Sequence, residues 1–298
     1  MKNITLEELL EAGCHFGHQV TRQNPKARDY IFETRDGIHI IDLTKTKEGL
    51  DEAADFVKRL ASRPDSSMII LGAKRQAQQV VREEVERAKI EEVSGLYSVT
   101  SRWIGGILTN FPEISKNFKR LKDLSEKLAD KKAQVGYTKK EVSLWEKERQ
   151  KLLSFYGGIY ELNKVPDALF IIDSHLEDLA VREANSMHLS TVGITDTNAD
   201  PTVIAHAIPA NDDAVGSIKL IVHHIVDAWI EGAKLRNGMT EVATSERKTN
   251  GSDTKNSKTA VEEAKKARVE LAPEKVEDQA VATTKKTARK KTKAEVAA

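Results

Sequence analysis

The sequence has little cysteine, few aromatic residues and no long apolar run, and each shortage excludes a class of protein. Its single cysteine, Cys14, excludes a disulfide framework and a metal site built from cysteines alone. No segment approaches the roughly 18 consecutive apolar residues that a membrane-spanning helix needs. The first residues lack the apolar stretch of a signal peptide, so we expect a cytoplasmic protein. Aromatic residues make up 5% of the chain and charged residues 31%, a balance that suits an abundant cytosolic protein.

The net charge of +1 is an average over unlike segments. Residues 102–151 hold 13 Lys/Arg against 7 Asp/Glu, and residues 241–298 hold 14 against 10. Global charge therefore gives no argument for a nucleic-acid partner, and any phosphate binding must be local. The alternative explanation of such a basic run is a solvated helical face.

Short apolar runs alternate with amphipathic segments along most of the chain. Thr5 and Glu8 form a capping-box pattern that predicts a short helix over 6–12, followed by an irregular polar loop at 15–26. Strands are predicted at 37–43, 68–71, 168–173 and 191–196, with helices at 44–60, 75–89, 177–188 and 213–234. This alternation predicts an α/β fold, a doubly wound parallel sheet in three αβα layers.

One segment, residues 111–157, contains no strand candidate. Its apolar residues recur at three- and four-residue steps in two stripes, separated by Gly136 and by a second capping-box pattern at Thr138 and Glu141. This predicts an inserted antiparallel coiled-coil hairpin. The α/β domain then covers 1–110 and 158–236, and residues 237–298 form a Lys/Glu/Ala-rich tail that we expect to be disordered.

The common fingerprints of α/β enzymes are missing. There is no G-x-G-x-x-G, no G-x-x-x-x-G-K-[ST] and no G-x-S-x-G. The nearest feature is the turn Gly72–Arg75, where Lys74 and Arg75 could hold an RNA phosphate or a mononucleotide. Cys14 beside His15 is better explained as buried packing, and we assign no catalytic residue. The alternative is a phosphate- or nucleotide-binding enzyme that uses Lys74 and an aspartate-bound metal.

Several clusters of cationic and polar residues are candidates for RNA contacts. A cation contacts phosphate, and an amide or an indole can add a hydrogen bond or stack on a base. For Trp103, the alternative to stacking on a base is burial in the protein core. For the basic hairpin, the alternative to RNA binding is a role as a protein-docking arm. The candidates are Arg22, Asn24, Lys26, Arg28, Lys74, Arg75, Arg102, Trp103, Asn110, Lys116, Lys119, Arg120, Lys139 and Lys140.

A metal site is a further hypothesis. His18 lies in the N-terminal loop, and Asp196 and Asp212 lie near the carboxyl ends of successive predicted strands, where α/β folds bring their ligands together. A mixed His/Asp set suits zinc or a similar ion. The alternative is that the N-terminal histidines, His15 and His18, hydrogen-bond to backbone or RNA.

Seven blocks of the sequence resemble, in order, the bacterial-type family of small-subunit ribosomal protein two. Each block is weakly specific alone, but together they span most of residues 5–236. The blocks are Leu9–His18, Asn24–Lys26, Gly37–Leu43, Arg102–Asn110, Pro166–Leu169, Asp196–Pro201 and Ile208–Ala214. The chain departs from the usual family pattern at Gln23, Ala27 and Ala210.

This resemblance implies a flavodoxin-like body with an inserted helical hairpin. It also implies a cytoplasmic, ribosome-bound and non-enzymatic constituent of the small ribosomal subunit that grips small-subunit rRNA between head and body. Neighbouring small-subunit proteins, including ribosomal protein one, are the implied protein partners. No membrane, small-molecule substrate or required cofactor is implied.

Overall fold

The computed structural model describes residues 3–130 and 134–237, all of which belong to one unit, Met1–Val242. The predicted tail, apart from its first residue, lies outside the described residues. No helix within the described ranges combines the length and apolar character needed to cross a membrane.

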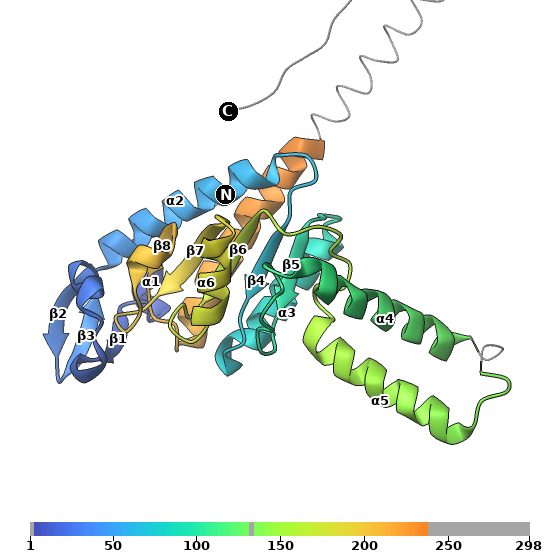
Figure 1. Cartoon of the computed structure of the whole chain (residues 1–298). Coiled ribbons are helices and arrows are strands. Elements are labelled where there is room, and N and C mark those ends of the chain that lie inside the picture. Colours follow the sequence, from blue (N-terminus) through green and yellow to red (C-terminus); the bar gives the residue numbers. More distant parts are fainter. Residues whose placement is uncertain (1–2, 131–133, 238–298) are drawn as a thin grey trace, which may run out of the picture. The chain divides into compact units, whose positions relative to one another are not determined.

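A five-stranded parallel sheet forms the centre of this unit (Figure 1). Its strands lie in the order β5-β4-β6-β7-β8, and every neighbouring pair is parallel. Counted along the chain, this is the order 2-1-3-4-5 of flavodoxin-like sheets. The strands are β4 (Met68–Leu71), β5 (Leu96–Val99), β6 (Ala168–Ile172), β7 (Ser190–Thr195) and β8 (His206–Pro209).

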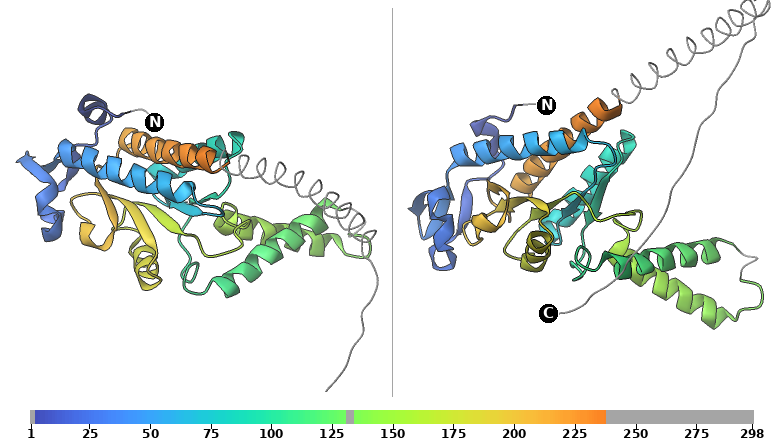
Figure 2. Two further views of the ribbon diagram at one scale, coloured as in Figure 1. Left: turned by 90° about the horizontal axis from the view of Figure 1, so that it is seen from above. Right: turned by 45° about the horizontal axis from the view of Figure 1, so that its top comes forward.

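Each face of the sheet is covered, because the strands are apolar on both sides. Ile70 and Phe170 lie in one buried cluster, whereas Ile69 and Leu169 lie in another. The first cluster includes residues of α2 (Leu43–Ala61), α3 (Arg75–Ile90) and a last helix at 215–237, and the second includes α6 (Asp178–Ser186) (Figure 2). The predicted layered α/β fold with a parallel sheet is confirmed.

A second sheet, small and antiparallel, is built from the N-terminal residues. Its strands are β1 (Phe16–Gln19), β2 (Ile31–Arg35) and β3 (Ile38–Ile41), in the order β1-β3-β2, preceded by helix α1 (Leu6–Glu11). The strand predicted at 37–43 therefore exists but pairs outside the parallel sheet. The predicted loop at 15–26 was wrong in part, since it holds β1 and the short 3-10 helix η1 (Val20–Arg22), with the start of η2 (Pro25–Tyr30).

Two long helices, α4 (Phe111–Ala129) and α5 (Lys139–Tyr156), lie side by side and extend away from the central sheet (Figures 1 and 2). At their base, the rings of Phe118 and Tyr156 meet with centroids 5.5 Å apart. Along α4 the apolar stripe is buried, but Tyr156 is the only fully buried residue of α5. The capping box of Thr138 and Glu141 is formed as predicted. We call these two helices and the residues between them the α4–α5 hairpin.

Candidate nucleic-acid interface and carboxylate cluster

The N-terminal loop is fastened to the loop that follows β7. The backbone N–H of Asn24 donates to the carbonyl of Thr197 at 2.8 Å, and that of His18 donates to the Thr197 hydroxyl at 2.9 Å. Lys26 is occupied, because its Nζ lies 2.6 Å from an oxygen of Asp200. Arg22 and Arg28 differ from it: they are exposed and pair with no acidic group among the described residues. The guanidinium groups of this loop are therefore the groups open to an external phosphate.

Asn24 has a local structural role in the same loop. Its Oδ1 accepts a hydrogen bond from the backbone N–H of Lys26 at 3.0 Å and so caps η2. An Asn followed by Pro at the first helical position is a common helix start. The side-chain oxygen expected to meet RNA is thus already engaged by the protein.

Four acidic residues meet at the carboxyl ends of the parallel strands, as expected for this topology. They are Asp173 after β6, Asp196 after β7, and Asp212 and Asp213 after β8, and we call them the carboxylate cluster. The ammonium of Lys74, just after β4, lies 2.7 Å from Asp212, 2.7 Å from Asp213 and 3.1 Å from Asp173. This corrects the expectation that Lys74 holds a phosphate, because its charge is neutralised within the protein.

Burial and mutual repulsion set the electrostatics of the cluster. Asp212 is fully buried, and burial together with the charges of Asp173 and Asp196 raises its pKa to about 7, against the opposing effect of Lys74. Burial lowers the pKa of Lys74, but the attraction of Asp212 and its neighbours outweighs this and raises it overall. The cluster therefore carries more negative charge than its cations cancel, and its ionisation depends on Lys74.

His18 completes a donor set within this cluster. Its Nδ1 lies 3.1 Å from Asp196 Oδ2, and the interaction with this carboxylate, against the effect of burial, raises the pKa of His18. Ligand atoms of His18, Asp196 and Asp212 lie within 4.8 Å of one another. Oδ2 of Asp212 is buried and has no hydrogen-bond partner among the described residues. An unpartnered carboxylate oxygen facing an imidazole and a second carboxylate fits the nitrogen and oxygen ligands of a divalent ion.

A buried glutamate holds the segment Arg102–Asn110. Glu183 of α6 accepts hydrogen bonds from the backbone N–H groups of Gly106 at 2.7 Å and Leu108 at 3.2 Å, and from the Trp103 indole at 3.4 Å. Trp103 is only 3% exposed, so burial rather than base stacking describes this side chain. Gly106 has a φ of +95°, which is the conformational reason for a glycine there. The fixed turn leaves Arg102 and Asn110 exposed.

The α4–α5 hairpin presents most of its cations to solvent. Lys119, Lys139 and Lys140 are exposed and have no ion-pair partner among the described residues. Lys116 pairs with Glu113 at 2.6 Å within α4, and Arg120 bridges to Glu148 of α5 at 2.9 Å. Such exposed pairs are weak and exchange readily for a phosphate. Arg75, at the start of α3, is likewise exposed.

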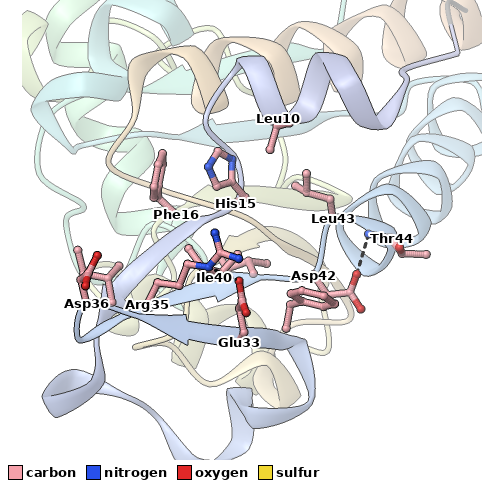
Figure 3. Close-up of a pocket in the computed structure, with 13 residues that line it drawn as sticks. Leu10, His15, Phe16, Glu33, Arg35, Asp36, Ile40, Asp42, Leu43 and Thr44 are labelled. Atoms are coloured by element: carbon pink, nitrogen blue, oxygen red, sulfur yellow. Dashed lines mark hydrogen bonds and ion pairs between the residues drawn. The ribbon is translucent and has the colours of Figure 1, made fainter.

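An apolar pocket of about 600 Å³ lies in the N-terminal part of the unit (Figure 3). Side chains of α1, β1, β2 and β3 line it, among them Leu10, Phe16 and Ile40. Phe32 on β2 is 71% exposed at this place, an unusual state for a large aromatic ring. Charged residues, Glu33, Arg35 and Asp36, also line the pocket. Apolar walls with charged residues among them are typical of a binding site for another macromolecule.

Neither cysteine chemistry nor nucleotide chemistry has a place in this arrangement. Cys14 is buried and burial raises the pKa of its thiol, as expected for packing. Lys74, the cation on which the enzyme alternative depended, is held by three carboxylates. The fold and its exposed cations define an α/β protein with a basic helical hairpin.

Comparison with known proteins identifies the family. The family model of ribosomal protein S2 matches residues 9–232. The small ribosomal subunit protein uS2 of Geotalea uraniireducens is 46% identical over 237 residues, covering 80% of this chain and 90% of that protein. The chain belongs to the ribosomal protein S2 family. It is therefore a ribosome-bound structural protein of translation in the cytoplasm and not an enzyme. Proteins of this family require no cofactor.

Proposed function

We propose that this chain is a structural constituent of the small ribosomal subunit and binds small-subunit rRNA through the exposed cations of the α4–α5 hairpin, of two loops and of the start of α3. The observation that carries the proposal is the set of exposed cations, all but Lys116 and Arg120 without an ion-pair partner among the described residues, together with the name of the relative as a small-subunit protein. The proposed phosphate contacts are Arg22, Arg28, Arg75, Arg102, Lys116, Lys119, Arg120, Lys139 and Lys140, with Asn110 beside them.

The architecture supports recognition of RNA shape rather than sequence. Ammonium and guanidinium groups spread over a long rigid helix pair contact phosphates and fix orientation, but they carry little base information. We propose that residues 111–157 act as an inserted coiled-coil arm on an α/β domain made of 1–110 and 158–236. Burial of most of the apolar stripe of α4 and the contacts of α4 with α5 support a fixed spacing of the cations on the arm.

Charge reversal on the hairpin tests the proposal. We expect the triple variant Lys116→Glu, Lys119→Glu, Lys139→Glu to lose at least 100-fold in affinity for purified small-subunit rRNA, with a shallower dependence on salt. The control reverses three exposed cations elsewhere, Arg59→Glu, Lys89→Glu and Lys219→Glu, and has the same net charge. Equal binding by the two triple variants would contradict phosphate contacts on the hairpin and favour a protein-docking arm.

We also propose that the apolar pocket around Phe32 docks ribosomal protein one. An exposed aromatic ring beside an apolar hollow suits an apolar or aromatic anchor from a partner chain. Phe32→Ala should weaken binding of purified ribosomal protein one by tenfold or more and leave rRNA binding unchanged. Ile90→Ala, which truncates an exposed apolar side chain on α3, is the control. Undiminished binding by Phe32→Ala would remove this assignment.

The third proposal is a zinc ion held by His18, Asp196 and Asp212. A bound divalent cation would offset the excess negative charge of the carboxylate cluster and tie the N-terminal loop to the sheet. Elemental analysis of the purified chain after dialysis against zinc should give one ion per molecule. His18→Ala should lose it, and the exposed histidine variant His188→Asn should keep it. A wild-type chain without stoichiometric zinc would exclude the site.

A further inference from the structure

The far end of the α4–α5 hairpin carries aromatic side chains as well as cations. Tyr137, in the segment before α5, is 51% exposed, and its ring meets the ring of Trp145 with centroids 4.6 Å apart and an interplanar angle of 63°. The ammonium of Lys127 on α4 lies 5.8 Å from the centroid of the Trp145 ring. Lys139 and Lys140 follow directly in the first turn of α5. We call Lys127, Tyr137, Lys139, Lys140 and Trp145 the hairpin tip.

An exposed tyrosine ring held edge to face by a tryptophan is fixed in orientation, because the pair restricts both side chains. A flexible surface tyrosine loses conformational entropy when a partner binds and fixes its ring. A ring that is already fixed offers a flat surface without that loss. The tip thus supplies an aromatic face of fixed orientation, with the ammonium of Lys127 against Trp145 and two lysines next to Tyr137 in the chain.

The charge around this aromatic face indicates the chemistry of its partner. The ammonium of Lys127 lies beside the Trp145 ring, and Lys139 and Lys140 follow closely after Tyr137 in the first turn of α5. Proteins that bind unpaired nucleotides combine a basic surface that follows the phosphates with aromatic rings on which bases stack. A protein partner with an apolar surface would not need this excess of lysines.

We infer that the hairpin tip binds an unpaired nucleotide of small-subunit rRNA, with its base stacked on the ring of Tyr137 and its phosphates beside Lys139 and Lys140. This inference rests on the proposed function and adds to it a base contact that charge alone cannot supply. Trp145 supports the tyrosine ring from behind and need not touch the RNA.

The chain contains its own optical reporter for this contact. Of its three tryptophans, Trp103 and Trp229 are buried, and only Trp145 is partly exposed. A base that stacks on Tyr137 lies within a few ångströms of Trp145. Addition of rRNA should therefore quench the fluorescence of the full chain, and the variant Trp145→Phe should lose this change.

The decisive experiment compares Tyr137→Ala and Tyr137→Phe in the full chain, with purified small-subunit rRNA as the probe. We expect Tyr137→Ala to bind about tenfold more weakly, because stacking of one base is lost, and Tyr137→Phe to bind like the wild type. The slope of log affinity against log salt should be the same in all three proteins, since no phosphate contact has changed. Leu144→Ala, another exposed apolar truncation on α5, should have no effect.

Two results would overturn the inference. Unchanged rRNA affinity of Tyr137→Ala, while the charge-reversed triple variant loses binding, would refute the base contact and leave the proposed function in place. Weaker association of Tyr137→Ala with whole small subunits but unchanged affinity for purified rRNA would show that the tip contacts a protein. If the triple variant also binds rRNA normally, the proposed function fails as well.

Discussion

At the carboxyl edge of the sheet Lys74 lies between three carboxylates, whereas Lys119, Lys139 and Lys140 of the α4–α5 hairpin have no ion-pair partner among the described residues. A lysine side chain thus has a different role in each region. At the sheet edge the ammonium cancels buried charge, so its contribution is to the free energy of folding. On the hairpin the ammonium remains solvated, so its contribution appears only when an anion binds.

The comparison also shows why a basic residue type alone says little about nucleic-acid binding. Lys74 and Lys139 both stand at the start of a helix, and a sequence pattern cannot separate them. Burial separates them, because a buried charge must be paired and an exposed charge need not be.

The largest difference is expected for Lys74→Met. Removing the ammonium leaves Asp173, Asp212 and Asp213 facing one another, so we expect a loss of about 3–5 kcal/mol in the free energy of unfolding. The same change at Lys119 on the hairpin should cost less than about 0.5 kcal/mol. Urea denaturation in the presence of a chelator measures both. Similar values for the two variants would contradict the division between the regions.

Glu183→Gln is expected to rank second. The side-chain amide of the glutamine places an N–H group where Gly106, Leu108 and Trp103 all supply donors. Buried N–H groups then lose their acceptor, and each such loss lowers the free energy of unfolding by about 1–3 kcal/mol. We expect a net loss of about 3 kcal/mol, measured by thermal unfolding. Glu126→Gln, an exposed change on α4, is the matched control and should leave the melting temperature unchanged. A stable Glu183→Gln variant would show that the turn does not depend on the carboxylate.

Glu177 of the α/β domain should make stability depend on pH in the opposite sense to the hairpin carboxyls, whose pKa values are lowered by their partners. Burial and the charge of Asp173 raise its pKa to about 7 in the folded chain, above the ordinary value of 4.5. The folded state then binds the proton more tightly, so stability is lost as the pH rises from 4.5 to 7. Glu177→Gln should be more stable than the wild type by up to about 3 kcal/mol at pH 8, and comparable at pH 4.

Denaturation curves at several pH values test this, with the exposed Glu86→Gln as control. Parallel pH profiles for Glu177→Gln and the wild type would show that the Glu177 carboxyl ionises normally.

Continuous apolar runs made the centre of the fold predictable. Met68–Leu71 and Ala168–Ile172 are buried on both faces of the sheet, so each is a continuous apolar run that is easily recognised as a strand. The strands β5 and β8 were missed, because Leu96–Val99 is half-buried and His206–Pro209 holds a histidine and a proline at the sheet edge. The small sheet was missed for a similar reason, since the side chains of β1 and β2 are mostly exposed.

The candidate site was predictable only where strand ends determine position. Asp196 and Asp212 were expected to meet because both follow strands or strand-like segments, and the structure brings them together with His18. Asp173 ends a predicted strand, as Asp196 does, and was overlooked. Glu183 carries no signal, because a glutamate within a helix is ordinarily exposed, and its partners are distant backbone N–H groups. The apolar pocket was also beyond sequence reasoning, since four separate segments line it.

The smallest effect is expected for the ion pair between Arg120 and Glu148 across the hairpin. Both hydrogen bonds of the pair are 2.9 Å long, but both side chains are exposed. A double-mutant cycle with Arg120→Ala and Glu148→Ala should therefore give a coupling free energy of only about 0.5 kcal/mol, which falls further at 1 M salt. The rRNA affinity should respond more strongly and with opposite signs: Arg120→Ala lowers it, and Glu148→Ala raises it by releasing the guanidinium and removing a repulsive charge. A coupling free energy above about 2 kcal/mol would place Arg120 with Lys74, as a residue that stabilises the fold.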